Sequence, residues 1–206
     1  MKQLLSNEEL KSLDERIKLF ESKTSVEFVC MIQNQSNEYL QGNLRGALLI
    51  NTILHGILLF LEPWQDGFNM LISFAFGVLL FQTLIEKIAP LKRAFVKSEE
   101  MQIEVNESAM THFFSKGLYK TDAKNGLLVY ISNFEHKINI IADEGLFPTY
   151  SQERWDEFNK ALAQKIKADE ACKGIEEFIE TIEDDMIKYF PAGDVNPDEL
   201  ANIIQN

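Results

Sequence analysis

The side chains best suited to chemistry are carboxylates next to predicted strands. Asp143 follows a strand predicted over 137–142 and precedes Glu144 and Gly145, a turn that can present oxygen atoms to a ligand. Ligands of open α/β sheets bind beyond the carboxyl ends of the strands. Magnesium and calcium prefer such oxygen ligands. A turn in which the Asp143 carboxylate bonds its own backbone is the alternative, and both interpretations stay open.

Three further residues are candidate metal ligands. Glu27 lies in a strand predicted over 26–32. Helices on both faces of the sheet would bury its carboxylate, which then needs a partner, either a metal ion or a basic side chain such as Arg154. Asp122 and Asn125 lie on the loop before the next strand. Asn125 and the glycine after it also form a common turn sequence.

Covalent catalysis has no candidate nucleophile. The sequence lacks Asp-x-Asp, a Cys with an Arg at phosphatase spacing, Gly-x-Ser-x-Gly, and a phosphate-binding glycine loop that ends in Lys-Ser or Lys-Thr. Hydrolysis of a phosphate ester would therefore need a metal, held by carboxylates, that polarises the phosphoryl group and activates water. Cys30 and Cys172 lack metal-ligand spacing, and we expect them to be reduced and structural.

Two apolar runs, 44–61 and 68–85, predict a transmembrane hairpin. Each is about as long as a helix needs to cross a hydrocarbon core of roughly 30 Å. From residue 46 onward neither run contains a charge, whereas the core helix of a soluble bundle normally has a polar face. After Arg45, the few polar residues in the runs are Asn51, Thr52, His55, Asn69, Ser73, Gln82 and Thr83.

Four residues in the runs have expected roles within the hairpin. Ionisable side chains in membranes are often functional, so His55 is a candidate proton relay or ligand. Asn51 lies one turn away and the second run has no charged partner, which favours interhelical hydrogen bonding instead. Ser73 and Gly77 form a small-x-x-x-small pair that would let the two helices pack closely.

The flanking charges predict the orientation of the hairpin. The connecting loop contains acidic residues and no lysine or arginine, whereas basic residues lie at the start of the first run, at Arg45, and after the second, at Lys87, Lys92, Arg93 and Lys97. Both termini should therefore be cytoplasmic. We expect no cleavable signal segment, and location in the plasma (inner) membrane if the source is bacterial.

The composition limits the possible partners. The formal charge of -12 argues against nucleic acid, since binding phosphate backbones needs a basic surface. Besides the lipid bilayer, metal ions or basic protein surfaces fit better. We expect one soluble domain interrupted by the hairpin, with residues 1–43 as its first part, 44–88 as the hairpin and 89–206 as the remainder.

The soluble parts alternate between helix and strand, which predicts an α/β fold. Hydrophobic periodicity indicates helices over 6–22, 105–116, 151–167 and 174–189, and strands over 26–32, 127–132 and 137–142. Ser6 and Glu9 fit a capping box, and Gly117 fits a left-handed helix end. Asn196 and Pro197 predict a short last helix.

Several stretches together resemble the TPM domain family. They are residues 121–146, with Asn-Gly-Leu-Leu-Val-Tyr-Ile-Ser and Ala-Asp-Glu-Gly-Leu, then 21–27, 109–117, Trp155 and Phe190-Pro191. The resemblance covers essentially the whole soluble part. A hairpin after the first strand resembles a bacterial membrane-bound subgroup. Where similar proteins tend to end with Asn-Glu-Leu-Pro, this chain has Asp-Glu-Leu-Ala at 198–201.

The resemblance implies a small central sheet sandwiched by helices. It also implies a family in which weak acid phosphatase activity and divalent metal binding are ascribed to some members. Two hypotheses follow: a membrane-tethered module that binds and helps to assemble another membrane protein, or a divalent-metal-dependent phosphomonoesterase of low activity. The missing nucleophile favours the binding module, whereas the carboxylates at strand ends support the hydrolase.

Overall fold

The computed structural model describes residues 4–61, 66–121, 123–193 and 202–205, and these divide into two compact units. The sheet unit comprises residues 1–36 and 102–206, and the hairpin unit comprises 37–101. The helices are α1 (Asn7–Glu21), α2 (Leu40–Leu61), α3 (Gly67–Lys87), α4 (Ala89–Ala94), α5 (Ser98–Ser115), α6 (Gln152–Lys167) and α7 (Ala171–Tyr189). The strands are β1 (Glu27–Gln33), β2 (Gly126–Ser132), β3 (Lys137–Ala142) and β4 (Ile203–Gln205). Single 3-10 turns lie at Leu118–Lys120 and Phe147–Thr149.

The sheet is mixed and has the order β3-β2-β1-β4. β1 runs parallel to β2 and to β4, and β3 is antiparallel to β2. In the register of the two central strands, Glu27 lies opposite Gly126 and Gln33 opposite Ser132. The α/β class expected from the sequence is confirmed.

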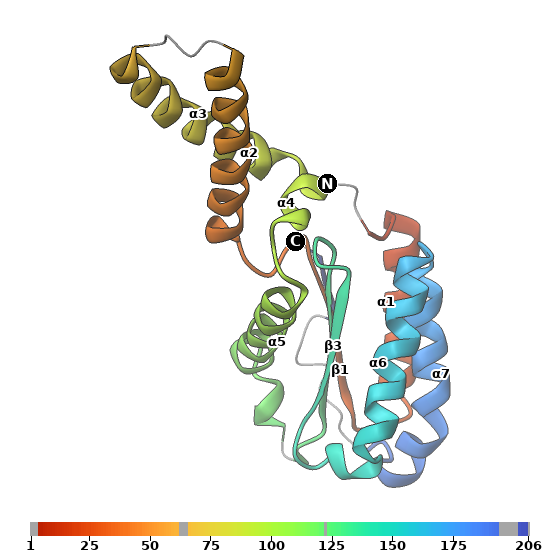
Figure 1. Cartoon of the computed structure of the whole chain (residues 1–206). Helices are drawn as coiled ribbons and strands as arrows, with labels where there is room; N and C mark the ends of the chain where they lie inside the picture. The colour runs from red at the N-terminus through yellow and green to blue at the C-terminus, as the bar shows by residue number, and fades with distance from the viewer. Residues whose placement is uncertain (1–3, 62–65, 122, 194–201, 206) are drawn as a thin grey trace. The chain divides into compact units, whose positions relative to one another are not determined.

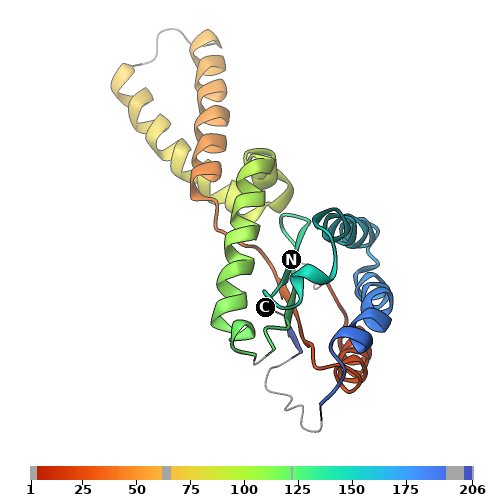
Figure 2. The ribbon, with the colours of Figure 1, turned by 90° about the horizontal axis from the view of Figure 1, so that it is seen from below.

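Helices cover both faces of the sheet (Figure 1, Figure 2). On one face, α1, α6 and α7 bury a large apolar cluster that includes Phe28 of β1. On the other face, α5 packs on a smaller cluster that includes Met31 and Tyr130. β1 is buried on both faces, which explains why its sequence, Glu-Phe-Val-Cys-Met-Ile-Gln, is an apolar run without alternation.

Short sequence motifs at the ends of helices predicted where several of them begin or end. Ser6 and Glu9 form the predicted capping box, with the Glu9 amide nitrogen 3.3 Å from Ser6 Oγ and the Ser6 amide nitrogen 2.8 Å from Glu9 Oε2. Gly117 has φ +81°, the left-handed conformation expected after a helix. α5 begins at Ser98, not at 105 as predicted, because five of its first seven residues are polar and only Met101 among these seven is buried.

The carboxyl-terminal segment differs from the expectation. β4 was not predicted, and it adds a parallel strand to β1 through the pairs Cys30–Ile203 and Met31–Ile204. The short last helix predicted at Asn196 lies outside the described residues, as does the family difference at 198–201.

α2 and α3 are long and apolar enough to cross a membrane. Of their most apolar stretches only 22% and 6%, respectively, is buried, whereas a core helix of a soluble protein is mostly buried. Phe60, Leu71 and Phe76 are 86%, 71% and 69% exposed. The two helices therefore present their apolar side chains outward.

Both cysteines are free thiols in the sheet unit. Burial, followed by the charge of Cys172, raises the pKa of Cys30 to about 12. Burial and the nearby Glu176 and Glu9 raise the pKa of Cys172 to about 11. Neither thiol is a thiolate nucleophile near neutral pH, because both pKa values lie well above it.

Candidate functional site

The structure brings three of the four predicted metal ligands to one end of the sheet. Glu27 opens β1, Asn125 directly precedes β2, and Asp143 directly follows β3. The Asp143 amide donates to the carbonyl of Gly126, 2.9 Å away. Because β3 is antiparallel, its carboxyl end lies beside the amino ends of β1 and β2, so this is not the edge at which parallel sheets normally bind ligands. Asp122 lies outside the described residues.

The two carboxylate oxygens of Asp143 have different surroundings. Oδ1 accepts a 2.8 Å hydrogen bond from the Glu144 amide, as expected for a turn aspartate. Oδ2 is buried and has no hydrogen-bond partner among the described residues. The facing loop is held in place by the Gly145 amide, which donates to Lys124 O, 2.9 Å away. A buried carboxylate oxygen is costly without a donor or a cation, so Oδ2 fits a cation ligand.

Asn125 and Glu27 are both buried at this end of the sheet, with Gly126 of β2 between Glu27 and Asp143. The Asn125 amide nitrogen Nδ2 donates to the carbonyl of Ser25 and to Ser25 Oγ. Arg154, suggested from the sequence as a partner of Glu27, instead pairs with Glu157 at 2.7 Å, since both project from the exposed side of α6. Within the described ranges no three His, Cys, Asp or Glu side chains come together, so backbone or amide oxygens would have to complete a metal site.

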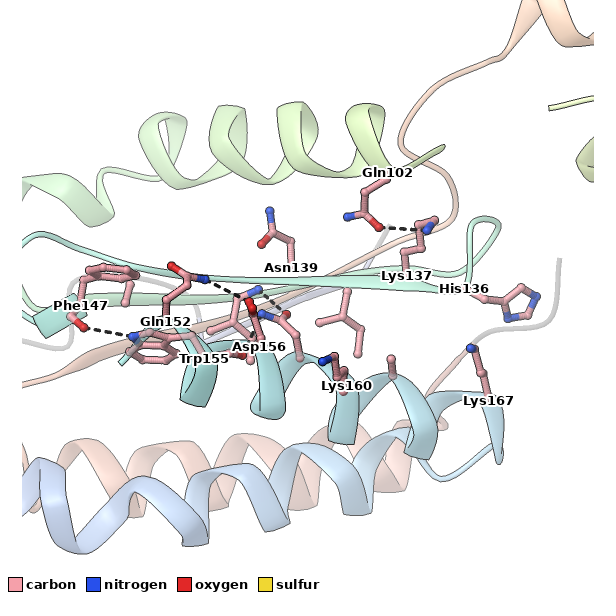
Figure 3. Close-up of a pocket in the computed structure, with 15 residues that line it drawn as sticks. Gln102, His136, Lys137, Asn139, Phe147, Gln152, Trp155, Asp156, Lys160 and Lys167 are labelled. Atoms are coloured by element: carbon pink, nitrogen blue, oxygen red, sulfur yellow. Dashed lines mark hydrogen bonds between the residues drawn. The ribbon is translucent and has the colours of Figure 1, made fainter. Parts of the chain in front are cut away.

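A groove of about 430 Å³ runs between the edge strand β3 and helix α6 (Figure 3). The Ile140 amide donates to Asn159 Oδ1 at 3.1 Å, so α6 reaches the outer edge of β3. At one end of the groove the Phe147 ring stacks on Trp155, with ring centroids 6.3 Å apart and planes 8° apart. Trp155 Nε1 also donates to the Phe147 carbonyl at 3.0 Å. The lining residues are Gln102, His136, Lys137, Ile138, Asn139, Ile140, Ala142, Phe147, Gln152, Trp155, Asp156, Asn159, Lys160, Ala163 and Lys167.

The charge of this groove is opposite to that of the chain. Lys137, Lys160 and Lys167 line it together with His136, and Asp156 is its single carboxylate among the described lining residues. Figure 3 shows His136, Lys137 and Lys167 at the end away from the aromatic pair. The formal charge of the whole chain is -12. Sequence reasoning missed the groove, because its lysines come from a strand and a helix whose pairing in space only the topology reveals.

A hydrogen-bonded polar cluster, also missed, lies at the carboxyl ends of β1 and β2. The Tyr130 hydroxyl is 3.0 Å from Ser36 Oγ and 2.8 Å from Ser108 Oγ. Glu135 accepts from the Ser36 amide at 2.9 Å and from the Ser132 hydroxyl. Burial raises the pKa of Tyr130. These hydrogen bonds hold the turn between β2 and β3 in place. Because the polar side chains of the cluster bond one another, we assign the cluster a structural role.

His112 lies on the rim of that polar cluster. Its ring stacks on Tyr130 with centroids 5.8 Å apart. Burial, and then the positive charge of Lys116, lower the pKa of His112. This lowering of the pKa favours the neutral form of the His112 ring beside Tyr130.

The four polar or small residues singled out in the hairpin meet in one seam between α2 and α3. Asn51 Nδ2 donates to Phe74 O at 2.9 Å, and His55 Nε2 lies 3.1 Å from Ser73 Oγ. Gly77 lies directly against Asn51 Oδ1, where a side chain would collide. Asn51 and His55 are 0% and 7% exposed, so the seam is polar inside and apolar outside.

Comparison with known proteins agrees with this architecture. Residues 93–194 match the family model of the TPM domain. The fold resembles the NMR structure of the BA42 protein from the psychrophilic bacterium Bizionia argentinensis, with a TM-score of 0.60 and 20% identity over 100% of this chain and 97% of that one. None of the curated proteins matches the chain. By the family match, the segment 93–194, which contains β2, β3, α6 and α7, is a TPM domain, and the chain shares its fold with the solved structure.

Proposed function

We propose that this is an integral membrane protein whose TPM domain binds another membrane protein or complex and assists its assembly. One observation carries the membrane part: α2 and α3 turn apolar side chains outward and enclose Asn51 and His55. In water, so large an exposed apolar surface favours aggregation. In lipid the same arrangement is favourable, because the tails contact the apolar side chains and the polar groups pair with each other.

The proposed orientation places both termini in the cytoplasm and the α2–α3 loop outside. The loop is acidic, whereas lysines and arginines follow α3, in line with the excess of positive charge on cytoplasmic flanks. In a bacterium the membrane would be the plasma (inner) membrane. The sheet unit would then lie in the cytoplasm, where its partner must be reachable.

Extraction and labelling test insertion and orientation. We expect the full chain to stay in the membrane pellet after an alkaline carbonate wash. With both native cysteines replaced, a cysteine at Asp66 should react with an impermeant maleimide in intact cells, whereas one at the exposed Lys173 should react only after permeabilisation. Release by carbonate would contradict insertion, and the reverse labelling pattern would contradict the orientation.

A second candidate function, a weak divalent-metal-dependent phosphomonoesterase, is favoured by the buried Oδ2 of Asp143, which lacks a hydrogen-bond donor among the described residues. Asp143, Glu27 and Asn125 would hold the ion, with Asp122 as a further proposed ligand. Calcium or magnesium would supply polarisation of a phosphoryl group and activation of water. The positive charge of the ion would offset the cost of burying the Asp143 oxygen.

Metal titration tests this second candidate. If calcium or magnesium binds, a concentration 100 times the dissociation constant should raise the free energy of unfolding by about 2.7 kcal/mol. Thermal unfolding and hydrolysis of p-nitrophenyl phosphate are followed in the same samples of full-length protein in detergent. Asp143→Asn, which keeps an acceptor for the Glu144 amide, should abolish both effects.

The exposed neighbour provides the control: Glu144→Gln should leave both effects unchanged. Stabilisation without turnover would support a cation site and contradict the esterase activity. If neither metal stabilises the protein and no turnover is seen, both the cation site and the esterase activity are contradicted.

A further inference from the structure

We propose that the groove between β3 and α6 binds an extended acidic segment of the partner, which adds to the sheet as a strand beside β3. This inference rests on the proposed binding function and names the chemistry of what is bound. Three features of the groove carry it: the open edge of β3, the two walls that flank it, and its charge.

The first feature is the direction of the β3 backbone groups. The Asp143 amide bonds Gly126 on β2, so by the alternation of an antiparallel pair the even-numbered residues of β3 turn their amides and carbonyls away from β2. The Ile140 amide confirms this, since it bonds the side chain of Asn159 and not a strand. Backbone groups of Ile138, Ile140 and Ala142 therefore line the outer edge. The side-chain amide of Asn159 lies where the peptide group of a further strand would lie.

The second feature is that the edge lies at the floor of a groove. α6 forms one wall, with Trp155, Asn159 and Lys160, and Gln102 of α5 forms part of the other. Gln102 is tied to the strand, because Lys137 Nζ donates to its side-chain oxygen at 2.9 Å. A groove between an edge strand and a helix suits strand addition, in which main-chain hydrogen bonds give affinity and flanking side chains give specificity. An added strand would replace Asn159 as the acceptor for the Ile140 amide.

The third feature is charge, and it selects the occupant. Among the described residues, Lys137, Lys160 and Lys167 make no ion pair, and Asp156 is the single carboxylate of the lining. In a chain of charge -12 this is a local positive patch that attracts acidic segments and repels basic ones. At the other end Phe147, 43% exposed, offers an aromatic surface to an apolar side chain.

The test uses a defined probe, the fluorescein-labelled peptide Glu-Val-Asp-Val-Glu-Phe, and full-length protein in detergent. We expect saturable binding by fluorescence anisotropy. The same peptide with alternate backbone amides methylated should bind about tenfold more weakly, because methylation removes strand pairing but keeps the charge. A peptide with lysines in the acidic positions should not bind.

A matched pair of charge variants locates the site. Lys160→Glu with Lys167→Glu should weaken binding about tenfold, since two attractive charges become repulsive. Lys11→Glu with Lys173→Glu makes the same change of net charge on the exposed faces of α1 and α7 and should leave binding unchanged. Circular dichroism and the thermal midpoint establish that both variants are folded.

Equal binding of the methylated peptide, or equal loss in the two charge variants, would overturn the inference. Absence of peptide binding would also overturn the inference. The lysines would then have the role of protecting an edge strand against aggregation. If the chain is still carbonate-resistant, that failure does not affect the proposed membrane role. Conversely, carbonate release with intact peptide binding removes the membrane role and leaves the groove assignment standing.

Discussion

Replacing Phe28 with alanine should remove about 3–5 kcal/mol from the free energy of unfolding of the sheet unit. The Phe28 side chain is 0% exposed in the middle of β1. Its ring lies 6.0 Å from that of Phe20 on α1 and 6.3 Å from that of Phe178 on α7, so it joins the strand to two helices. Domains of ordinary size have only about 5–15 kcal/mol in total, so much of the stability would be lost.

Urea unfolding in detergent, followed by near-ultraviolet circular dichroism of the aromatic cluster, measures this loss. Phe114→Ala provides the matched control, because it is the same substitution at a side chain that is 52% exposed. The control should cost about 1 kcal/mol or less. Equal losses in the two variants would mean that Phe28 does not occupy the core described above.

Replacing Gly77 with leucine should separate the two helices of the hairpin. Any side chain at this position collides with Asn51, whose amide donates to Phe74 O at 2.9 Å. Overpacking of this kind costs about 1–3 kcal/mol, and the interhelical hydrogen bond would be lost in addition. Gly56→Leu is the control, because nothing lies within 4 Å of a side chain placed there.

The separation can be measured with spin labels on cysteines introduced at Leu48 and Leu80, with the native cysteines replaced. Both positions face outward, at 41% and 58% exposure, so the labels do not disturb the seam. The mean distance between the labels should increase by on the order of 2 Å in Gly77→Leu and stay unchanged in Gly56→Leu. An unchanged distance in both variants would show that Gly77 does not set the approach of the helices.

Most helices and the three longer strands could be predicted because their signals are local. The capping box at Ser6, the left-handed Gly117 and the apolar stripes of α1, α6 and α7 each depend on a few neighbouring residues. β4 could not be predicted, because three residues carry almost no pattern and owe their conformation to pairing with β1, far away in the sequence.

The sites were harder to predict because they depend on strand direction. The sequence indicates that Asp143 ends a strand and that this strand forms a hairpin with the run over 127–132, and the structure confirms the antiparallel pair. The carboxylate was nevertheless expected at the carboxyl edge of the parallel strands, whereas the direction of β3 puts it at the opposite edge. Glu27, Asn125 and Asp143 are nevertheless at one end of the sheet, because the register joins the starts of β1 and β2. The groove was harder still to predict from the sequence, because Gln102, Lys137 and Lys167 come from three different elements and line one groove only through tertiary packing.

The central position of β1 also bears on the order of events during synthesis. β1 leaves the ribosome early, yet the strands on its two sides begin only at Gly126 and Ile203. At roughly 5–20 residues per second, β1 waits on the order of ten seconds without a neighbour on either edge. In the proposed topology the hairpin reaches the membrane during this delay. A nascent apolar strand with two open edges can pair with other chains, so we expect β1 to be the segment of the sheet most exposed to aggregation until its partners are synthesised.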